Sequence, residues 1–373
     1  MGDNIVEYTE VTTENNQYPP LTSSRKGIFL QTEYFAGNQI ASDDNTGYNI
    51  VPYGYFTYRH MSDDEVFHFN INDIVEKGIV STLYPVFTTD ENLDSRYLQY
   101  QLNYGHEFAK FAILQKQGGS RTYMYLNKLR QLHLTMPNHV EEQKAISSFF
   151  MNLDHLITLH QRKFDKLQVL KKAMLEKMFP KNGSSVPEIR FKGFTDAWEQ
   201  RKFSDLYAPL VERNSDLLPY NKTLSVATMT YKTDGNGAAD SSLANYKRLR
   251  TGDIAFEGHT SKSFRYGRFV LNDVGDGIMS PRFSALRPLA QMPTNFWKYY
   301  IHYEPIMRKI LVASTKAGTM MNELVIDEFL KSSVLVPSIE EQTRIGSILK
   351  NIDNLITLHQ RKPYSHIQRR CNM

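Results

Sequence analysis

An internal repeat with one constant offset constrains this chain more than any other feature of its sequence. The run LITLHQRK at Leu156–Lys163 recurs letter for letter at Leu355–Lys362, 199 positions later. The run EEQ at Glu141–Gln143 recurs at Glu340–Gln342 with the same offset. A chance similarity of low complexity would drift in register, whereas this register is constant. We therefore interpret the chain as a tandem duplication.

Each copy of the repeat has a β-rich part and a helical part. Short β-like runs such as Asn49–Tyr58 are separated by Gly, Pro, Asn and Asp residues, and a helical stretch interrupts them at Asp94–Leu114 and Thr294–Val312. We expect an α+β fold with two domains of mixed, β-rich α/β structure, each followed by a long helix. The expected boundaries are 1–140 for the first domain, 141–180 for its helix, 181–187 for a linker, 188–339 for the second domain, 340–362 for the second helix and 363–373 for an aberrant tail.

The two helical segments carry apolar residues at the spacing of a coiled coil. Helices of matching pattern in one chain most simply pack on each other, and His160 and His359 take equivalent positions as polar register pins. Contact with a partner protein is the alternative for both histidines. The predicted coiled-coil interface consists of Ile146, Phe149, Leu153, Leu156, His160, Leu167 and Leu170 in the first helix and Ile345, Ile348, Ile352, Leu355 and His359 in the second.

Composition indicates a soluble, cytoplasmic chain. Its 373 residues are 41% hydrophobic, and the single cysteine, Cys371, excludes an internal disulfide and a multi-cysteine zinc site. No apolar run approaches the roughly 18 residues that would cross a bilayer. The charge is unevenly distributed, since residues 1–140 hold 10 basic against 16 acidic side chains and residues 186–339 hold 20 against 16. Net charge alone therefore does not predict a polyanionic partner for the first domain.

The local sequences resemble those of the specificity subunit of type I restriction–modification systems. The run FKGFTDAWEQRK at Phe191–Lys202 is similar to the family's lead into a target-recognition domain. The segments around EEQ and LITLHQRK are similar to its two helical regions. The resemblance implies that each domain reads one half of a bipartite DNA site and that the helices form an antiparallel coiled coil. A helix of 39 residues spans about 58 Å, enough to separate two readers by one DNA turn of roughly 34–36 Å.

The same resemblance implies the partners and cofactors. Double-stranded DNA, two methyltransferase subunits and the restriction subunits are the expected partners, and no membrane is expected. S-adenosylmethionine, ATP and Mg are expected on the partner subunits and none on this chain. The sequence contains no phosphate-binding loop of the type G-x-x-x-x-G-K-[ST]. We therefore expect a DNA-recognition subunit with no catalytic residues and no metal site.

The candidate DNA contacts lie in equivalent loops of the two domains. Arginine, lysine, histidine and small polar side chains there can reach phosphates or base edges, and ordinary turns or surface solubility are the alternative readings. The candidates are Arg59, His60, Ser120, Arg121 and Tyr123 in the first domain, and His259, Lys262, Arg265, Tyr266, Arg268, Thr319 and Asn322 in the second. The second set is basic with interleaved aromatics, which suits nucleic acid better.

Two departures from the family pattern keep other functions open. The first domain lacks a counterpart of the lead-in at Pro187–Arg201, and Pro363 is expected to end the second helix early. In one alternative, the chain is a silent or truncated specificity cassette that works only as a dimer. A coiled-coil scaffold that binds only proteins is another reading, and a tandem carbohydrate-binding protein is a third.

Overall fold

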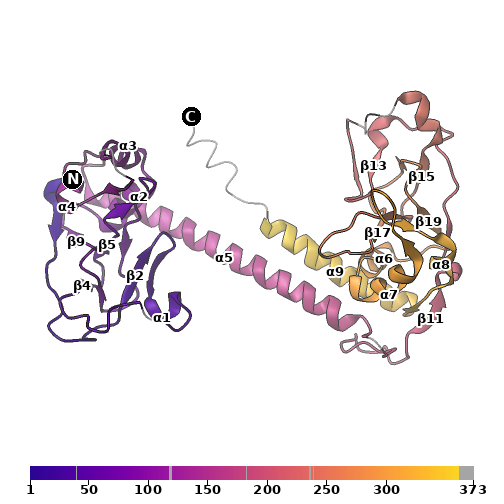
Figure 1. The fold of residues 1–373 in the computed structure, drawn as a ribbon, viewed down its shortest axis with the longest axis horizontal. Coiled ribbons are helices and arrows are strands. Elements are labelled where there is room, and N and C mark those ends of the chain that lie inside the picture. The colour runs from indigo at the N-terminus through magenta and orange to yellow at the C-terminus, as the bar shows by residue number, and fades with distance from the viewer. Residues whose placement is uncertain (39, 117–119, 182, 235–236, 238, 361–373) are drawn as a thin grey trace. The chain divides into compact units, whose positions relative to one another are not determined.

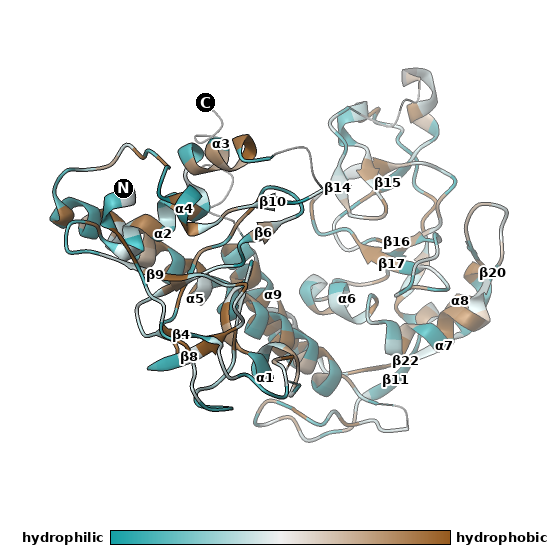
Figure 2. Ribbon diagram, turned by 60° about the vertical axis from the view of Figure 1, so that its left-hand side comes forward, coloured by the Kyte–Doolittle hydropathy of each residue, from teal (hydrophilic) through white to brown (hydrophobic). Residues whose placement is uncertain are grey.

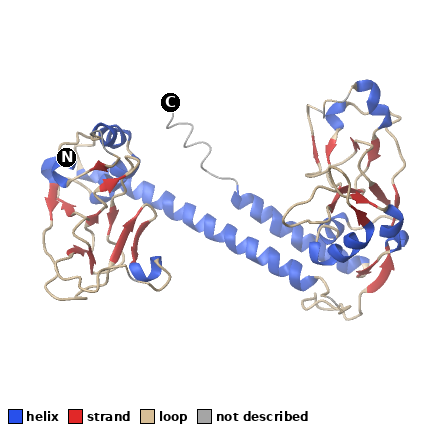
Figure 3. Cartoon of the chain, viewed as in Figure 1, coloured by secondary structure: helices blue, strands red, loops and turns tan. Residues whose placement is uncertain are grey.

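The computed structural model describes residues 1–38, 40–116, 120–181, 183–234, 237 and 239–360 (Figure 1). The expected tail at 363–373, with Cys371, lies outside the described residues. The chain divides into two compact units, Met1–Thr158 and Leu159–Met373. Both contain short strands joined by long loops, and long helices accompany them (Figure 3). This arrangement confirms the expected α+β fold class.

The first unit is built on an antiparallel sheet with the strand order β1-β9-β5-β7. The four strands are β1 (Ile5–Glu7), β9 (Val86–Thr89), β5 (Phe56–Thr57) and β7 (Asn70–Ile71). Three separate two-stranded pairs accompany it among the described residues: β2 (Leu21–Ser24) with β3 (Gly27–Leu30), β4 (Asn49–Pro52) with β8 (Lys77–Val80), and β6 (Met61–Ser62) with β10 (Thr122–Tyr123). The helices are η1 (Gly2–Asn4), α1 (Gln31–Tyr34), α2 (Ser95–Tyr104), α3 (His106–Leu114), α4 (Leu126–Leu129) and the first part of α5 (Val140–Met178).

The second unit repeats this architecture around a sheet of order β12-β19-β16-β17. The strands are β12 (Tyr207–Pro209), β19 (Ala285–Pro288), β16 (Ile254–Glu257) and β17 (Arg268–Leu271). Its pairs are β11 (Glu199–Lys202) with β22 (Ser333–Val336), β13 (Leu224–Ser225) with β14 (Thr230–Tyr231), β15 (Lys247–Leu249) with β18 (Gly277–Met279), and β20 (Thr315–Lys316) with β21 (Glu323–Leu324). Its helices are η2 (Phe203–Asp205), η3 (Tyr220–Lys222), η4 (Asp240–Asn245), α6 (Thr294–Tyr300), α7 (Glu304–Ser314), α8 (Ile326–Lys331) and α9 (Ile339–Gln360).

The core of the second unit is rich in aromatic rings. Phe296, Trp297, Tyr300 and Phe179 are fully buried. Phe179 meets Phe296 and Tyr300 edge to face, as Phe296 meets Trp297, while Phe296 and Tyr300 stack at an interplanar angle of 26°, and ring quadrupoles favour both edge-to-face and offset-stacked pairs. Figure 2 shows hydrophobic segments such as β17 inside this unit. Because Phe179 follows directly after α5, the end of that helix is fastened into this core.

The duplication extends to individual contacts. Phe56 faces Ile71 across β5 and β7, and Ala255 faces Val270 across β16 and β17, with both members shifted by 199 positions. The hydroxyl groups of two equivalent tyrosines donate to equivalent aspartates, over 2.6 Å from Tyr100 to Asp154 and 2.7 Å from Tyr299 to Asp353. Each of these bonds joins a helix of the globular part to the long helix that follows it.

Within the second unit, the last part of α5 runs antiparallel beside α9 (Figure 1). The two Nδ1 atoms of His160 and His359 lie 2.9 Å apart, and the Lys171 ammonium is 2.7 Å from the Asp353 carboxylate. Of the two readings of the histidines, the structure shows this hydrogen-bonded contact between the helices. Each histidine is the 199-residue counterpart of the other.

The buried face of α9 differs from the predicted coiled-coil interface. The buried apolar residues are Ile345, Leu349, Ile352 and Ile356, whereas Ile348 is half-buried and Leu355 is exposed. The reason is α6, which packs directly on α9 and selects a face rotated from the heptad positions. Gly346 permits this approach, because a Cβ atom there would lie 2.6 Å from the Phe296 nitrogen.

The predicted interface residues of α5 are also less enclosed than a coiled coil requires. Phe149 is 60% exposed and Leu156 is 51% exposed, and Leu170 is exposed as well. Ile146 instead packs against the core of the first unit, while Leu153 and Leu167 are half-buried. The described part of α9 ends at Gln360, directly after His359, which contacts His160. Before His160, α5 is contacted by α2, through the Tyr100–Asp154 hydrogen bond and the Tyr100–Phe150 ring contact.

The close approach at Gly346 generates a stability prediction. Gly346→Ala places a methyl group against the backbone of α6, and overpacking of this kind costs about 1–3 kcal/mol, against a gain of about 1 kcal/mol in helix propensity. We expect a net loss of unfolding free energy in urea denaturation followed by tryptophan fluorescence. Both tryptophans, Trp198 and Trp297, are buried in this unit, so the signal reports it specifically.

Ser347→Ala is the matched control, because it makes a small change at the next, exposed position of the same helix. A Gly346→Ala protein as stable as the unmodified chain would contradict the packing described for α6.

Candidate nucleic-acid interface

The candidate residues of the second unit lie around the loop 258–267, which connects β16 with β17, and around Asn322, which bonds to that loop. We call this region the second tip, and the equivalent region of the first unit the first tip. The Asn322 amide nitrogen donates to the Gly258 carbonyl over 2.9 Å, and its side chain donates to the Arg265 carbonyl over 3.2 Å. A Cβ atom on Gly258 would lie 2.0 Å from the Asn322 carbonyl oxygen, so glycine is required there. The structure thus joins two segments that the sequence places more than 50 residues apart.

Some side chains of this tip are exposed and unpaired within the described part of the chain, and others are held by hydrogen bonds or packing. Among the described residues, no carboxylate pairs with Lys262 or Arg265, and both are exposed. Arg268 is held, since its guanidinium donates to the Ala227 carbonyl over 2.9 Å and lies over the Phe264 ring. Tyr266 is half-buried and packs against the core, so its ring serves packing.

His259 is oriented by a buried acid. Its Nδ1 lies 2.5 Å from Oε1 of Glu257, which is almost completely buried, while the imidazole ring is more than half exposed. The contact with this carboxylate holds one nitrogen of the ring in place. Thr319 lies nearby, lining one surface hollow together with Asn322 and Arg282.

The equivalent tip of the first unit is electrostatically different. Three carboxylates in a row, Asp63, Asp64 and Glu65, form ion pairs with three cations, and the pairs are Arg121–Asp63 at 2.9 Å, Arg25–Asp64 and Lys116–Glu65. The Arg25 guanidinium holds the pKa of Asp64 well below its usual range. The 199-residue counterpart of Asp63 is Lys262, so an anionic position of one tip is cationic in the other.

The remaining candidates of the first tip divide between surface and interior. Arg59 and Ser120 are exposed, and no carboxylate pairs with Arg59 among the residues described. His60 is only 7% exposed, and its Nδ1 contacts the Leu83 carbonyl. Tyr123 is exposed on strand β10, which pairs with β6. We predicted a direct contact of His60 with DNA. In the structure its ring is buried and supports the loop.

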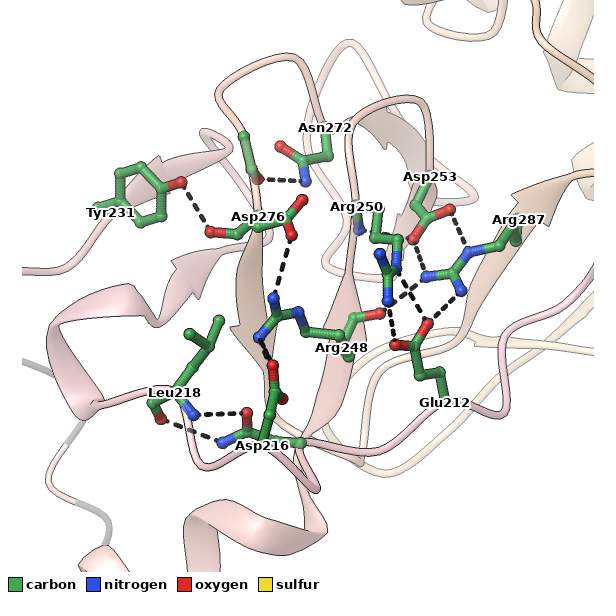
Figure 4. Close-up of polar contacts among 12 residues, drawn as sticks. Glu212, Asp216, Leu218, Tyr231, Arg248, Arg250, Asp253, Asn272, Asp276 and Arg287 are labelled. Carbon is green, nitrogen blue, oxygen red and sulfur yellow. Dashed lines mark hydrogen bonds and ion pairs between the residues drawn. The ribbon is translucent and has the colours of Figure 1, made fainter.

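An ion-pair network that sequence reasoning missed lies beside the second sheet (Figure 4). Glu212 accepts from Arg250 and from Arg287, and Arg287 also donates to Asp253 over 2.7 Å. Nearby, the almost buried Arg248 pairs with Asp216 and Asp276, each at 3.0 Å. The paired residues lie up to 75 positions apart, and no local pattern marks them.

In this network, arginines pair with Glu212, Asp216, Asp253 and Asp276. Three neighbouring cations have no carboxylate partner among the described residues. The Arg213 guanidinium donates to the Asn245 carbonyl, and the Lys247 ammonium donates to the Phe283 carbonyl. Burial, and secondly the charge of Arg213, lower the pKa of Lys247. Arg282 extends over the Phe283 ring and makes no ion pair within the described residues. Arg213, Lys247 and Arg282 are therefore further cationic candidates that the sequence analysis did not select.

Two searches of the described residues were negative. No group of three or more His, Cys, Asp or Glu side chains there could hold a metal ion. None of the helices in the described ranges is long and apolar enough to cross a membrane.

This chain is similar to proteins of a known family. Residues 261–366 match the family model described as "Type I restriction modification DNA specificity domain". Two curated relatives from Methanocaldococcus jannaschii are each 22% identical to this chain. The type I restriction enzyme MjaVIII specificity subunit aligns over 77% of this chain and 70% of its own length, and the putative type I restriction enzyme MjaX specificity subunit over 72% and 64%.

A solved structure supports the fold. The type I restriction–modification system S subunit from M. genitalium superposes with a TM-score of 0.53 at 11% identity, over 96% of this chain and 90% of that one. At this identity the match shows the fold alone. Together the comparisons confirm the resemblance to specificity subunits of type I restriction–modification systems.

The network around Glu212 generates a prediction about acid stability. Its bonds to Arg250 and Arg287 lower the pKa of Glu212 to about 2, below the value of about 4.3 in an unfolded chain. The carboxylate therefore stabilises the second unit fully above the unfolded value, and the stabilisation is lost as the pH falls towards 2. We expect Glu212→Gln to unfold at lower urea than the unmodified chain at pH 6, with the difference shrinking below pH 4.

Tryptophan fluorescence again follows this unit, and Glu91→Gln is the control, because Glu91 is exposed and forms no ion pair among the described residues. A difference between Glu212→Gln and the unmodified chain that stayed constant from pH 6 to pH 2 would contradict the assignment.

Proposed function

We propose, on the premise that this chain is a member of the type I restriction–modification specificity-subunit family, that it binds double-stranded DNA and reads a bipartite sequence. Each unit reads one half-site through the tip formed by its two joined loops. The observation that carries the proposal is the exposed cationic tip of the second unit, where Lys262 and Arg265 have no carboxylate partner within the described residues. Unpaired cations on an exposed loop are the side chains that neutralise phosphates and release counterions.

The two tips contribute differently to binding. The second tip supplies phosphate contacts through Lys262 and Arg265 and a directed hydrogen-bonding group through His259. In the first tip, Arg121 must exchange the carboxylate of Asp63 for a phosphate, so its electrostatic contribution is smaller. Arg59, also exposed at this tip, has no carboxylate partner among the described residues. Asn322 holds the second loop in place, and both Thr319 and Asn322 offer polar atoms to the DNA.

The helices provide the spacing and the docking surface for other subunits. We propose that α5, with its 39 residues, sets the distance between the half-sites. We also propose that its exposed apolar residues, including Phe149 and Leu156, contact the methyltransferase subunits. Exposed apolar side chains that gather on one helix are typical of a contact with another protein. The restriction subunits then join the assembly.

In this proposal the chain itself is not catalytic. S-adenosylmethionine, ATP and Mg act on the partner subunits, and this chain supplies sequence recognition. The exposed apolar residues of α5 would equally serve a scaffold that binds only proteins. DNA binding separates the two functions.

The test of the function is methylation mapping in cells that express the chain with a methyltransferase subunit. We expect a new methylated motif with two short defined halves and a fixed gap. A folded complex that binds DNA with no sequence preference, or that does not bind DNA at all, would overturn the proposal.

A binding measurement tests the cationic tip directly. Lys262→Gln combined with Arg265→Gln should weaken duplex binding and lower the slope of log K against log salt by about 2, since each lost phosphate contact removes about 1. The affinity is measured by fluorescence anisotropy of labelled duplex DNA at several salt concentrations.

The matched control is Arg308→Gln combined with Lys331→Gln, which removes the same charge from residues paired with Glu304 and Glu328 on α7 and α8. An equal loss of slope in both double variants would mean that net charge, and not the tip, determines binding.

A further inference from the structure

The first tip carries an aromatic surface that its charged residues do not explain. Along Thr122–Tyr125 the side chains alternate, because successive residues of an extended strand face opposite sides. Thr122 and Met124 are buried, while Tyr123 is 38% exposed and Tyr125 is 48% exposed. The two tyrosines therefore share one outward face.

The rings on this face are almost parallel. Tyr123 and Tyr125 have an interplanar angle of 10° and a centroid distance of 6.0 Å. Behind them, the His60 ring lies 5.0 Å from Tyr125 at 25° and 6.0 Å from Tyr123 at 34°. The buried imidazole thus supports the two exposed rings from the protein side. We call Tyr123 and Tyr125 the tyrosine platform.

The platform is held rigidly by the backbone beneath it. The Met124 amide donates to the His60 carbonyl over 2.7 Å, and the Tyr58 hydroxyl donates to the Met124 carbonyl over 2.9 Å. Thr122 faces Ser62 in the β6–β10 pair. A surface fixed in this way loses little conformational entropy when a ligand binds.

The platform has the character of a stacking surface for a neutral ring. Arg121, two positions before Tyr123, is paired with Asp63, and the outward face itself consists of the two phenol rings. Two exposed, parallel phenol rings attract a flat π-system, and nucleobases stack on aromatic side chains whatever their sequence. Bases inside a duplex are covered by their neighbours, so only a base that has left the stack can lie on such a face.

The counterpart positions in the second unit lack this surface. The residues 199 positions after Tyr123 and Tyr125 are Asn322 and Leu324, and Leu324 is buried in the core. The two tips occupy equivalent places, but the positions that carry exposed rings in the first hold Asn322 and a buried leucine in the second.

From these observations we propose that the tyrosine platform binds an unstacked nucleobase at the half-site of the first unit. The inference rests on the proposed DNA binding and deepens it. The first unit recognises a local opening of the duplex, and the second unit supplies most of the phosphate contacts. Tyr123 and Tyr125 contact the base, and His60 is a positioning residue.

The test uses the full chain and duplex DNA that carries 2-aminopurine, either paired with thymine or unpaired opposite an abasic site. Binding of the unmodified chain should quench the unpaired fluorophore and leave the paired one nearly unchanged. Tyr123→Leu combined with Tyr125→Leu should abolish the quenching and weaken binding to the unpaired duplex by about tenfold. Tyr123→Phe combined with Tyr125→Phe keeps both rings and should behave like the unmodified chain.

Two readouts separate the possible failures. If the anisotropy assay shows no binding to any duplex, the proposed function fails. If duplexes bind but the leucine and phenylalanine double variants quench equally, the platform inference fails. A leucine variant that no longer binds β-linked glucose oligomers, with unchanged DNA binding, would make the rings a carbohydrate surface and also overturn it.

Discussion

A buried glutamine side chain at the start of each long helix is the contact on which the rest of the architecture depends. The side-chain amide of Gln143 donates to the Pro137 carbonyl over 2.9 Å, and that of Gln342 donates to the Pro337 carbonyl over the same distance. Each side-chain oxygen accepts a second bond from the globular part, from the Asp94 amide and from the Trp297 indole. Because both glutamines are almost fully buried, these bonds fix the angle at which each helix leaves its domain.

On this repeated frame, charge is distributed in opposite ways at the two tips. The first tip balances its cations with Asp63, Asp64 and Glu65, whereas Lys262 and Arg265 at the second tip have no carboxylate partner among the described residues. Duplication thus preserved the sheet order and the helix attachments while the exposed loops diverged. Loops tolerate such change because few buried contacts depend on their side chains.

The sequence predicted the features that depend on local pattern or on the repeat. The long helices, the equivalence of the two units and the fold class follow from periodicity and from the 199-residue offset. The ion pair of Arg121 with Asp63 was not predictable, because pairing between distant loops follows from tertiary folding. The buried face of α9 was missed for a similar reason, since α6 favours Leu349 and Ile356 over Leu355. The burial of His60 beneath Tyr125 was not predictable either, because it depends on the pairing of two loops that lie far apart in the sequence.

The glutamine anchors also define where chimeric proteins can be joined. Each anchor bonds to a proline carbonyl five or six residues before it, so donor and acceptor belong to one short segment. A junction between Pro137 and Gln143 would pair a domain end from one parent with a helix start from another. A junction upstream of Pro137, with its counterpart upstream of Pro337, would keep each proline bond but would take Gln143 and Gln342 from a different parent than their partners Asp94 and Trp297. Interchange of whole modules therefore has to keep Asp94 together with Gln143 and Trp297 together with Gln342.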